Sequence, residues 1–119
     1  MIPNFRAWDK VAEDMFIPEV LELDKNGKVT GFFSKGTMFS IEDFELLQST
    51  GLKDINGKEI FEGDIVRNNY GEHGHIKWLR GGFVYHEDGA NFYLFSIGAG
   101  QPFEIVGNIY EHPHLLGEE

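Results

Sequence analysis

The segment Leu47–Val66, LQSTGLKDINGKEIFEGDIV, constrains the fold of this chain more than any other stretch. Asn56-Gly57 lies within it, and Asn-Gly is the strongest two-residue hairpin signal because both central residues of a type I′ turn need a positive φ. Gly63-Asp64 then marks a second turn before the apolar pair Ile65-Val66. The segment therefore predicts a tight turn centred on Asn56-Gly57, a short strand, a second turn and a buried strand.

The rest of the chain repeats this pattern of short apolar strands separated by turn residues. The pattern D-x-N-G-K occurs at residues 24–28 and again at 54–58, and we interpret it as reuse of one turn chemistry because the flanking residues do not match. Residues 40–48 predict a short helical turn followed by a strand, with Ser40 as the N-cap. Further strands are expected at 5–9, 21–23, 29–33, 65–69, 75–79, 83–86, 92–97 and 103–110.

Five short strands with tight turns after Gly63 are typical of a small barrel or sandwich. We expect a mainly β protein, with a small C-terminal SH3-like barrel of about five strands and an N-terminal β element packed on it. The expected division is 1–50 and 51–116, with one continuous domain over 1–116 as the alternative. The predicted core consists of Ile65, Trp78, Phe83, Phe95, Ile105 and Ile109.

Composition excludes several kinds of site. The 119 residues contain no Cys, which rules out disulfides, thiolate nucleophiles and Cys-type zinc sites. The first ten residues lack the apolar stretch of a signal peptide, and no run approaches the roughly 18 apolar residues of a membrane helix. These features predict a cytoplasmic protein with no membrane partner.

The formal net charge is −10, and the acidic excess is spread along the chain. Residues 1–50 carry 5 basic and 9 acidic side chains, and residues 51–119 carry 5 and 11. Binding to a phosphate backbone depends on Lys and Arg displacing counterions, and only Arg67, Lys77 and Arg80 lie near the aromatic strands. We therefore expect no direct binding to double-stranded DNA.

Three groups of polar residues have residue types found in metal or catalytic sites, but each has a simpler structural interpretation. The histidine pairs His73/His75 and His112/His114 have i, i+2 spacing but no convincing third metal ligand. A calcium loop starting at Asp54 fails because its sixth and twelfth positions are Glu59 and Ile65. The acidic cluster Glu59, Glu62 and Asp64 has no accompanying nucleophile or cofactor motif. We predict no catalytic residue, no bound metal and no cofactor.

Aromatic residues make up 14% of the chain, which is many for one small domain. Most of the Phe residues are expected in the core, because alternate strand positions face it. The remaining aromatics suit a groove for an extended peptide better than a nucleic-acid stacking platform, since few basic residues accompany them. The candidate interaction surface is Trp8, Tyr70, Tyr85 and Tyr93.

Three separated motifs resemble one known family. FRAWD at residues 5–9, the segment Leu47–Val66 and VGNIYE at 106–111 occur in the order found in the YopX family of phage and prophage proteins, and the resemblance covers about residues 2–116. It implies a prophage protein in the cytoplasm of a bacterial host and implies no activity.

Together these features predict a non-catalytic protein-interaction or accessory module. The alternative is an acidic, DNA-mimic-like inhibitor of a host nucleic-acid-binding protein. In both cases the partner is a protein, and the net charge of −10 favours a basic one. The sequence gives neither the partner nor the oligomeric state.

Overall fold

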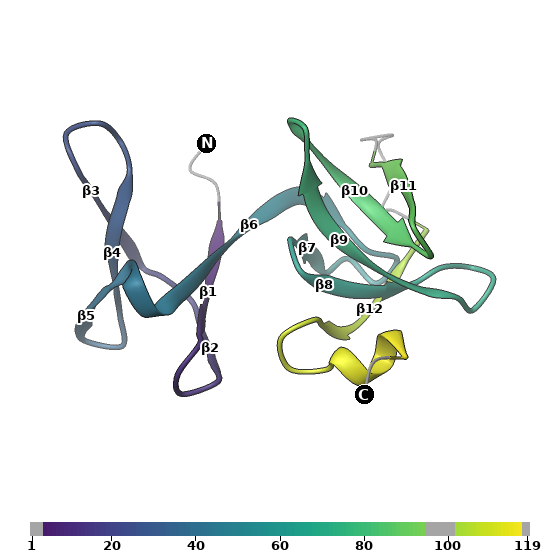
Figure 1. The fold of residues 1–119 in the computed structure, drawn as a ribbon, viewed down its shortest axis with the longest axis horizontal. Coiled ribbons are helices and arrows are strands. Elements are labelled where there is room, and N and C mark those ends of the chain that lie inside the picture. The colour runs from purple at the N-terminus through teal and green to yellow at the C-terminus, as the bar shows by residue number, and fades with distance from the viewer. Residues whose placement is uncertain (1–3, 95–101, 118–119) are drawn as a thin grey trace. The chain divides into compact units, whose positions relative to one another are not determined.

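The computed structural model describes residues 4–94 and 102–117, which are mainly β, as predicted. Within those ranges there is no α-helix, and the only helical segments are two short 3₁₀ turns. No helix in the described part of the chain is long and apolar enough to cross a membrane. The chain divides into two compact units, residues 1–48 and 49–119 (Figure 1).

The first unit is built from two groups of antiparallel strands. One places β1 between β2 and β6, and the other has the order β3-β4-β5. In chain order the elements are β1 (Phe5–Asp9), β2 (Asp14–Phe16), β3 (Val20–Leu23), β4 (Val29–Ser34), β5 (Thr37–Ser40), the 3₁₀ turn η1 (Ile41–Asp43) and the start of β6 (Phe44–Lys53). Ser40 caps η1 as predicted, accepting a long hydrogen bond of 3.5 Å from the Glu42 N–H.

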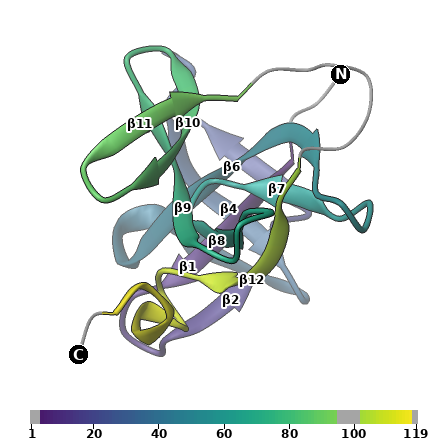
Figure 2. The ribbon, with the colours of Figure 1, turned by 90° about the vertical axis from the view of Figure 1, so that its right-hand side faces the viewer.

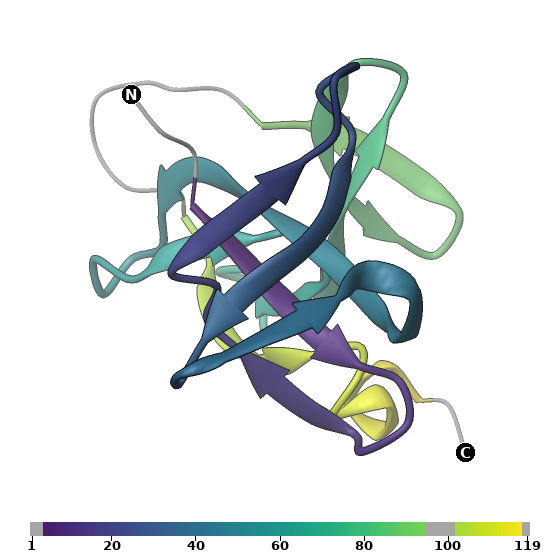
Figure 3. The same ribbon diagram turned by 90° about the vertical axis from the view of Figure 1, so that its left-hand side faces the viewer.

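The core of the first unit lies between these two groups of strands. Figure 3 shows β3, β4 and β5 crossing in front of β1 and β2. Ala7 of β1, Phe32 of β4 and Phe44 of β6 are buried there, and the Phe32 and Phe44 rings meet edge to face with centroids 4.8 Å apart. Burying such a ring stabilises the fold by roughly 1.5–3 kcal/mol. The partly buried residues around them are Phe16, Leu21, Phe39, Ile41 and Leu46.

The second unit contains a five-stranded antiparallel sheet in the order β11-β10-β9-β8-β12, together with the end of β6 paired to β7. Figure 2 faces this unit, with β11 beside β10. Its elements are β7 (Glu59–Phe61), β8 (Asp64–Arg67), β9 (His73–Leu79), β10 (Gly82–Glu87), β11 (Ala90–Tyr93), β12 (Glu104–Asn108) and the 3₁₀ turn η2 (Pro113–Leu116). Closure of this sheet into an SH3-like barrel, and packing of the first unit on it, stay predictions.

The core of the second unit is one face of this sheet together with β7. Ile60, Val66, Ile76 and Tyr85 are buried, and Phe83, Leu94, Phe103 and Ile105 pack against them. Gly74 is required in β9, because a Cβ there would lie 2.6 Å from the Tyr85 ring and 2.5 Å from the His86 carbonyl oxygen. The glycine lets the Tyr85 ring lie directly on the neighbouring backbone.

The turns follow the predicted positions but divide into two types. Gly57 has φ 82°, as predicted, whereas Asn56 keeps a negative φ, so the expected type I′ turn at this pair is wrong. The Gly57 N–H donates to the Asp54 carbonyl over 3.1 Å, the pattern of a type I turn followed by a left-handed glycine. Two-residue turns with positive φ at both positions occur instead at Lys35-Gly36, Arg80-Gly81 and Asp88-Gly89.

The predicted core is only partly right. Ile65 is fully buried, and Phe83, Ile105 and Ile109 are intermediate. Trp78 was expected inside, but its side chain is 50% exposed because it lies at the end of β9, next to the Arg80-Gly81 turn and beyond the buried centre at Ile76. Phe95 lies outside the described residues.

Candidate functional site

The second unit contains a shallow, partly polar groove of about 330 Å³. Three segments bring its walls together: the Asp54–Lys58 turn, the end of β8 and the start of β12. The lining residues are Ile55, Asn56, Arg67, Asn68, Asn69, Pro102, Phe103 and Glu104. Amide groups, one ion pair and a few apolar side chains therefore define its chemistry.

The turn forms because the Asp54 carboxylate organises its own backbone. One carboxylate oxygen, Oδ1, accepts hydrogen bonds of 2.8 Å from both the Asn56 and the Lys58 N–H. The Asp54 N–H in turn donates to the Lys58 carbonyl over 2.7 Å. This self-capping is the property that makes Asp favourable at the start of such a turn.

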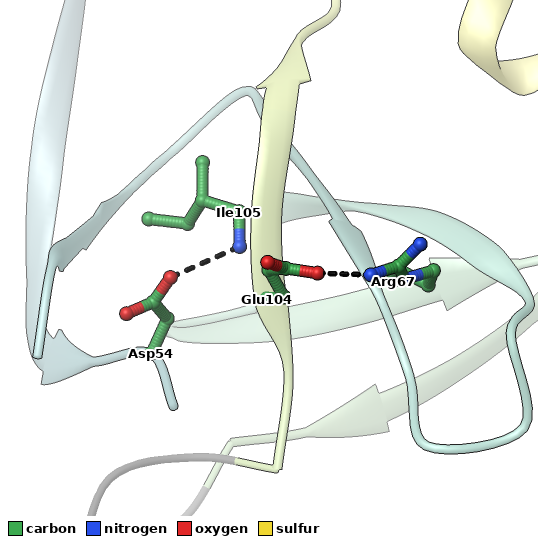
Figure 4. Close-up of polar contacts among 4 residues, drawn as sticks. All are labelled: Asp54, Arg67, Glu104 and Ile105. Carbon is green, nitrogen blue, oxygen red and sulfur yellow. Dashed lines mark hydrogen bonds and ion pairs between the residues drawn. The ribbon is translucent and has the colours of Figure 1, made fainter. Parts of the chain in front are cut away.

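The second carboxylate oxygen of Asp54 reaches a distant strand. Oδ2 accepts a hydrogen bond of 3.0 Å from the Ile105 N–H in β12 (Figure 4). The Ile55 N–H donates to the Phe103 carbonyl over 2.8 Å, which adds a second link between the turn and the β12 side of the groove. Asp54 is only 1% exposed, yet both carboxylate oxygens are satisfied. The carboxylate therefore fastens the turn to β12.

Two opposing effects act on the pKa of Asp54. Burial alone would raise the pKa, but the N–H groups of Ile105, Lys58 and Asn56 and the positive charge of Lys58 together outweigh it. The pKa of Asp54 is therefore lowered from its ordinary value, and the side chain is ionised at neutral pH. An ionised carboxylate with N–H donors on both oxygens is a structural anchor.

Arg67 and Glu104 form an ion pair beside this anchor (Figure 4). They are directly opposite each other on β8 and β12, so the strand register itself brings the two side chains together. Both are partly exposed, and such pairs contribute only about 0–1 kcal/mol. The pair leaves a guanidinium and a carboxylate at the groove that can also bind a ligand.

A buried tyrosine and a second self-capped turn border the groove. Asn68 repeats the Asp54 arrangement, its Oδ1 accepting from the Tyr70 N–H at 2.9 Å and from the Glu72 N–H at 3.0 Å. The Asn68 Nδ2 lies 3.2 Å from a Glu72 carboxylate oxygen and 3.4 Å from the Tyr85 hydroxyl, which donates to Glu87. Burial first, and the hydrogen bond to Glu87 second, raise the pKa of Tyr85 above its ordinary value.

The structure separates the four aromatics predicted to form an interaction surface. Trp8 and Tyr85 are buried, so they do not belong to an exposed surface. Trp8 lies in β1, between β2 and β6, and the Tyr85 ring stacks on Phe103 with centroids 4.8 Å apart. Tyr70 is exposed in the turn after β8, and Tyr93 is 48% exposed at the end of β11. An interaction role for these two stays a prediction.

Two exposed aromatics were not in the predicted surface. Trp78 is 50% exposed and Phe92 is 58% exposed. Both lie on the face of the sheet that carries the core, because Trp78 opposes Phe83 and Phe92 opposes Tyr85. The available signal was position: Trp78 lies two residues before the Arg80-Gly81 turn, and Phe92 lies three residues after the Asp88-Gly89 turn.

One of the two histidine pairs expected from the sequence spacing is found, because the His112 and His114 rings meet edge to face with centroids 6.3 Å apart, whereas His75 meets His86. His75 and His86 are directly opposite on β9 and β10, with ring centroids 5.1 Å apart, and His86 Nδ1 is 2.8 Å from the Asn91 side-chain oxygen. His112 Nδ1 accepts a hydrogen bond of 3.2 Å from the Asn108 N–H. Within the described residues no three His, Asp or Glu side chains are grouped as a metal site. That no metal binds the predicted His pairs stays a prediction.

The acidic residues near the Gly63 turn have structural partners. The Asp64 carboxylate is buried and accepts a hydrogen bond of 2.8 Å from the Phe61 N–H. Glu59 accepts a hydrogen bond from the Ser49 hydroxyl. Both contacts hold strand ends and turns in place.

Known families and structures resemble this chain over nearly its whole length. The family model described as "YopX protein" matches residues 4–117. The crystal structure of protein EF1440 from Enterococcus faecalis is similar with a TM-score of 0.73 and 26% identity, over 98% of this chain and 99% of that chain. The X-ray structure of protein yopX from Bacillus subtilis has a TM-score of 0.67 and 18% identity, over 100% of this chain and 99% of that chain. Curated proteins provide no match.

Proposed function

This chain belongs to the YopX protein family, and we propose that it acts as a non-catalytic protein-interaction module. The observation that carries this proposal is the aromatic patch, which we define as Trp78 and Phe92, half-exposed on one face of the second unit. Aromatic residues are enriched at protein interfaces, where they bury much apolar area at low entropic cost. A solvated aromatic pair of this kind suits a partner surface.

The patch is rigid enough to serve as a contact surface. The Trp78 ring meets Phe83 edge to face, with centroids 4.9 Å apart. The Phe92 ring lies beside the buried Tyr85 ring, with centroids 6.3 Å apart. The Leu94 N–H donates to the Phe83 carbonyl over 3.1 Å, just past the end of β11. Because the neighbouring side chains are packed, docking on the patch costs little further ordering.

The groove beside Asp54 supports binding better than catalysis. Its polar groups are amides and an ion pair whose partners already satisfy one another. The two most buried carboxylates nearby, Asp54 and Asp64, accept backbone N–H bonds and hold turns. We therefore propose that the protein is not an enzyme.

The wider setting is also part of the proposal. Family membership and the absence of Cys support a phage- or prophage-encoded protein that works in the cytoplasm of a bacterial host. The strand order β11-β10-β9-β8-β12 and its short hairpins support an SH3-like barrel as the form of the second unit. Small barrels of this class commonly present an aromatic surface to extended peptides.

An acidic inhibitor that imitates nucleic acid is the second candidate. The observation that favours it is the spread of charge, because both halves of the chain are acidic, with 9 acidic against 5 basic side chains in residues 1–50 and 11 against 5 in residues 51–119. Attraction of this kind to a basic protein is screened over about 8–10 Å at ordinary ionic strength. Such a partner should dissociate at high salt, and its binding should not depend on the aromatic patch.

Affinity capture with matched variants separates the two candidates. The wild-type chain, the patch variant Trp78→Ser with Phe92→Ser, and the control Met38→Ser are each used as bait in host lysate at low and high salt. Met38 is similarly exposed but lies on β5 in the first unit. The proposal expects a partner that the patch variant loses and the control keeps. A partner lost only at high salt, and held equally by all three baits, supports the acidic inhibitor and contradicts the patch.

A further inference from the structure

Strand β11 is an edge of the five-stranded sheet. The two-residue turn Asp88-Gly89 connects it to β10, so the residues that flank the turn, Glu87 and Ala90, form a hydrogen-bonded pair. Hydrogen-bonded pairs recur at every second residue, so Phe92 forms the next one with Tyr85. The Leu94 bond to the Phe83 carbonyl continues the same alternation. The N–H and C=O groups of Asn91 and Tyr93 therefore face away from β10, towards the side of β11 on which the described residues place no further strand.

Apart from its length of four residues, this edge lacks the features that usually protect an edge strand. Natural edges are shortened, bulged or given charged residues and proline. Edge strand β12 carries Glu104 and a bulge between Ile105 and Gly107, and edge strands β2 and β7 are three residues long. Strand β11 reads ANFY, pairs without a bulge, and all four of its residues are exposed.

The side chains beside this edge define what a docked strand would contact. Ala90 and Phe92 lie on the core-bearing face, and beyond Ala90 lies Glu87. Glu87 and Glu72 both approach the Asn68 amide, at 3.5 and 3.2 Å. Among the described residues neither carboxylate is in an ion pair, so negative charge is available next to an exposed aromatic ring.

We propose that β11 takes up an extended segment of a partner protein by antiparallel strand addition, and that this segment has a Lys or Arg opposite Ala90 and an apolar residue opposite Phe92. The inference rests on the proposed function, and it names the place of contact and the partner's chemistry. Main-chain bonds to Asn91 and Tyr93 give affinity, and the two side-chain positions give specificity.

The geometry fits a basic side chain at the first position. Strands in a sheet lie roughly 4.8 Å apart, so a docked residue opposite Ala90 is two spacings, roughly 10 Å, from Glu87. The Ala90 methyl is too small to block the space between them, and the long stem of Lys or Arg can cross it. At Ala90 and Phe92 the new pairs are of the closer, non-hydrogen-bonded kind, which favours side-chain contact.

A second copy of this chain is the less favoured occupant. Each chain has a net charge of −10, so two copies repel each other at long range. The preferred occupant is therefore a basic segment of another protein.

Fluorescence anisotropy with a labelled peptide of about seven residues tests the inference. The peptide alternates threonine with one lysine and one valine two residues apart, and its control has glutamate in place of the lysine. Saturable binding with a Kd below about 1 mM is expected for the lysine peptide only. Equal binding of both peptides, or none by either, overturns the inference.

Two variants probe the edge and the charge separately. Asn91→Pro removes only an outward N–H, and Asn91→Ala is its control because both lose the contact with His86. The proline variant should abolish peptide binding while the alanine variant keeps it. Glu87→Gln should weaken binding of the lysine peptide by about two- to fivefold. It should not weaken any residual binding of the glutamate peptide. Equal binding by the two Asn91 variants refutes strand addition.

Hydrogen exchange on the wild-type chain tests the same contact without a substitution, so it remains informative if the proline variant fails to fold. The lysine peptide should slow exchange of the Asn91 and Tyr93 amides, and unchanged rates there contradict the proposal. Peptide-free sedimentation that shows a dimer lost in Asn91→Pro would assign the edge to a second copy and overturn it too. If capture is lost in the patch variant but kept in Asn91→Pro, the edge inference fails while the proposed function stands.

Discussion

The turns at Asp24–Lys28 and Asp54–Lys58 share the sequence D-x-N-G-K and the same local geometry, yet they differ in how much they stabilise the fold. In both, the Asp Oδ1 accepts the N–H groups two and four residues on, at 2.8–3.0 Å, and the glycine has φ 83° or 82°. Asp24 is exposed, and its carboxylate accepts hydrogen bonds from within its own turn, from the Asn26 and Lys28 N–H groups. Asp54 is buried and also accepts the Ile105 N–H, 51 residues away. Local sequence sets turn geometry, whereas the tertiary context sets how much the turn stabilises the fold.

Removing the carboxylate of Asp54 or of Asp24 should give the largest difference in stability between the two turns. Asp54→Ala leaves three partly buried N–H groups without their acceptor, and we expect a loss of about 3–5 kcal/mol in the free energy of unfolding. In Asp24→Ala water replaces the carboxylate, and the loss should stay within about 1 kcal/mol. Urea denaturation of both variants measures this. Equal losses would contradict the account.

Acid should remove the contribution of Asp54 in a predictable direction. The folded-state pKa of Asp54 is lowered, so its contribution to stability is fully present above the unfolded pKa of about 3.9 and is lost as pH falls through the folded-state value. The stability difference between wild type and Asp54→Asn should be constant above about pH 5 and shrink below it. A difference that is unchanged down to the acid transition would show that the ionised form is not the one preferred by the fold.

The turn at Asn68–Glu72 is a third copy with an amide in place of the carboxylate. Asn68→Asp keeps the acceptor for the turn but removes the donor to Glu72 and Tyr85 and adds charge beside two carboxylates. We expect a loss of about 1–2 kcal/mol in the free energy of unfolding at neutral pH. Thermal melts of Asn68→Asp and of Asn68→Ala, which loses the acceptor for the turn as well as the donor, compare the cost of the added charge with that of the lost acceptor. A wild-type melting temperature for Asn68→Asp would contradict the expected loss.

Glycine substitutions should give the smallest contrast between the turns. A Cβ at Gly27 or Gly57 meets nothing within 4 Å, so the cost of Ala comes from the positive φ alone. Gly27→Ala and Gly57→Ala should each destabilise by about 1 kcal/mol. A much larger cost at Gly57 would mean that tertiary context changes the local geometry as well.

The sequence predicted local features better than long-range ones. Most of the strands, the capped turn after Ser40 and the positive φ of Gly57 depend on neighbouring residues, and they were predicted correctly. Strands β2 and β5 were not predicted, and residues 95–97 of the strand expected at 92–97 lie outside the described residues. The turn type at Asn56 was wrong because the Asp54 carboxylate binds two N–H groups that a type I′ turn would present differently. Asn-Gly alone does not carry that information.

The burial of the aromatic side chains could not be predicted without the tertiary structure. Trp8 and Trp78 both lie in apolar strand stretches, but Trp8 is in a strand paired on both sides and Trp78 is near a hairpin end. Their exposures are therefore the reverse of those predicted. The link from Asp54 to Ile105 was likewise invisible, since the strand carrying Ile105 begins 50 residues after Asp54, at Glu104.

Native-state hydrogen exchange at the Ile105 amide tests the central claim most directly, because this N–H donates to Asp54 Oδ2. The account predicts that Asp54→Asn greatly speeds exchange at Ile105, beyond any change in global stability, while Asp24→Asn leaves it unchanged. If Ile105 is equally protected in wild type and both variants, the Asp54 turn does not hold β12, and the two turns are equivalent after all.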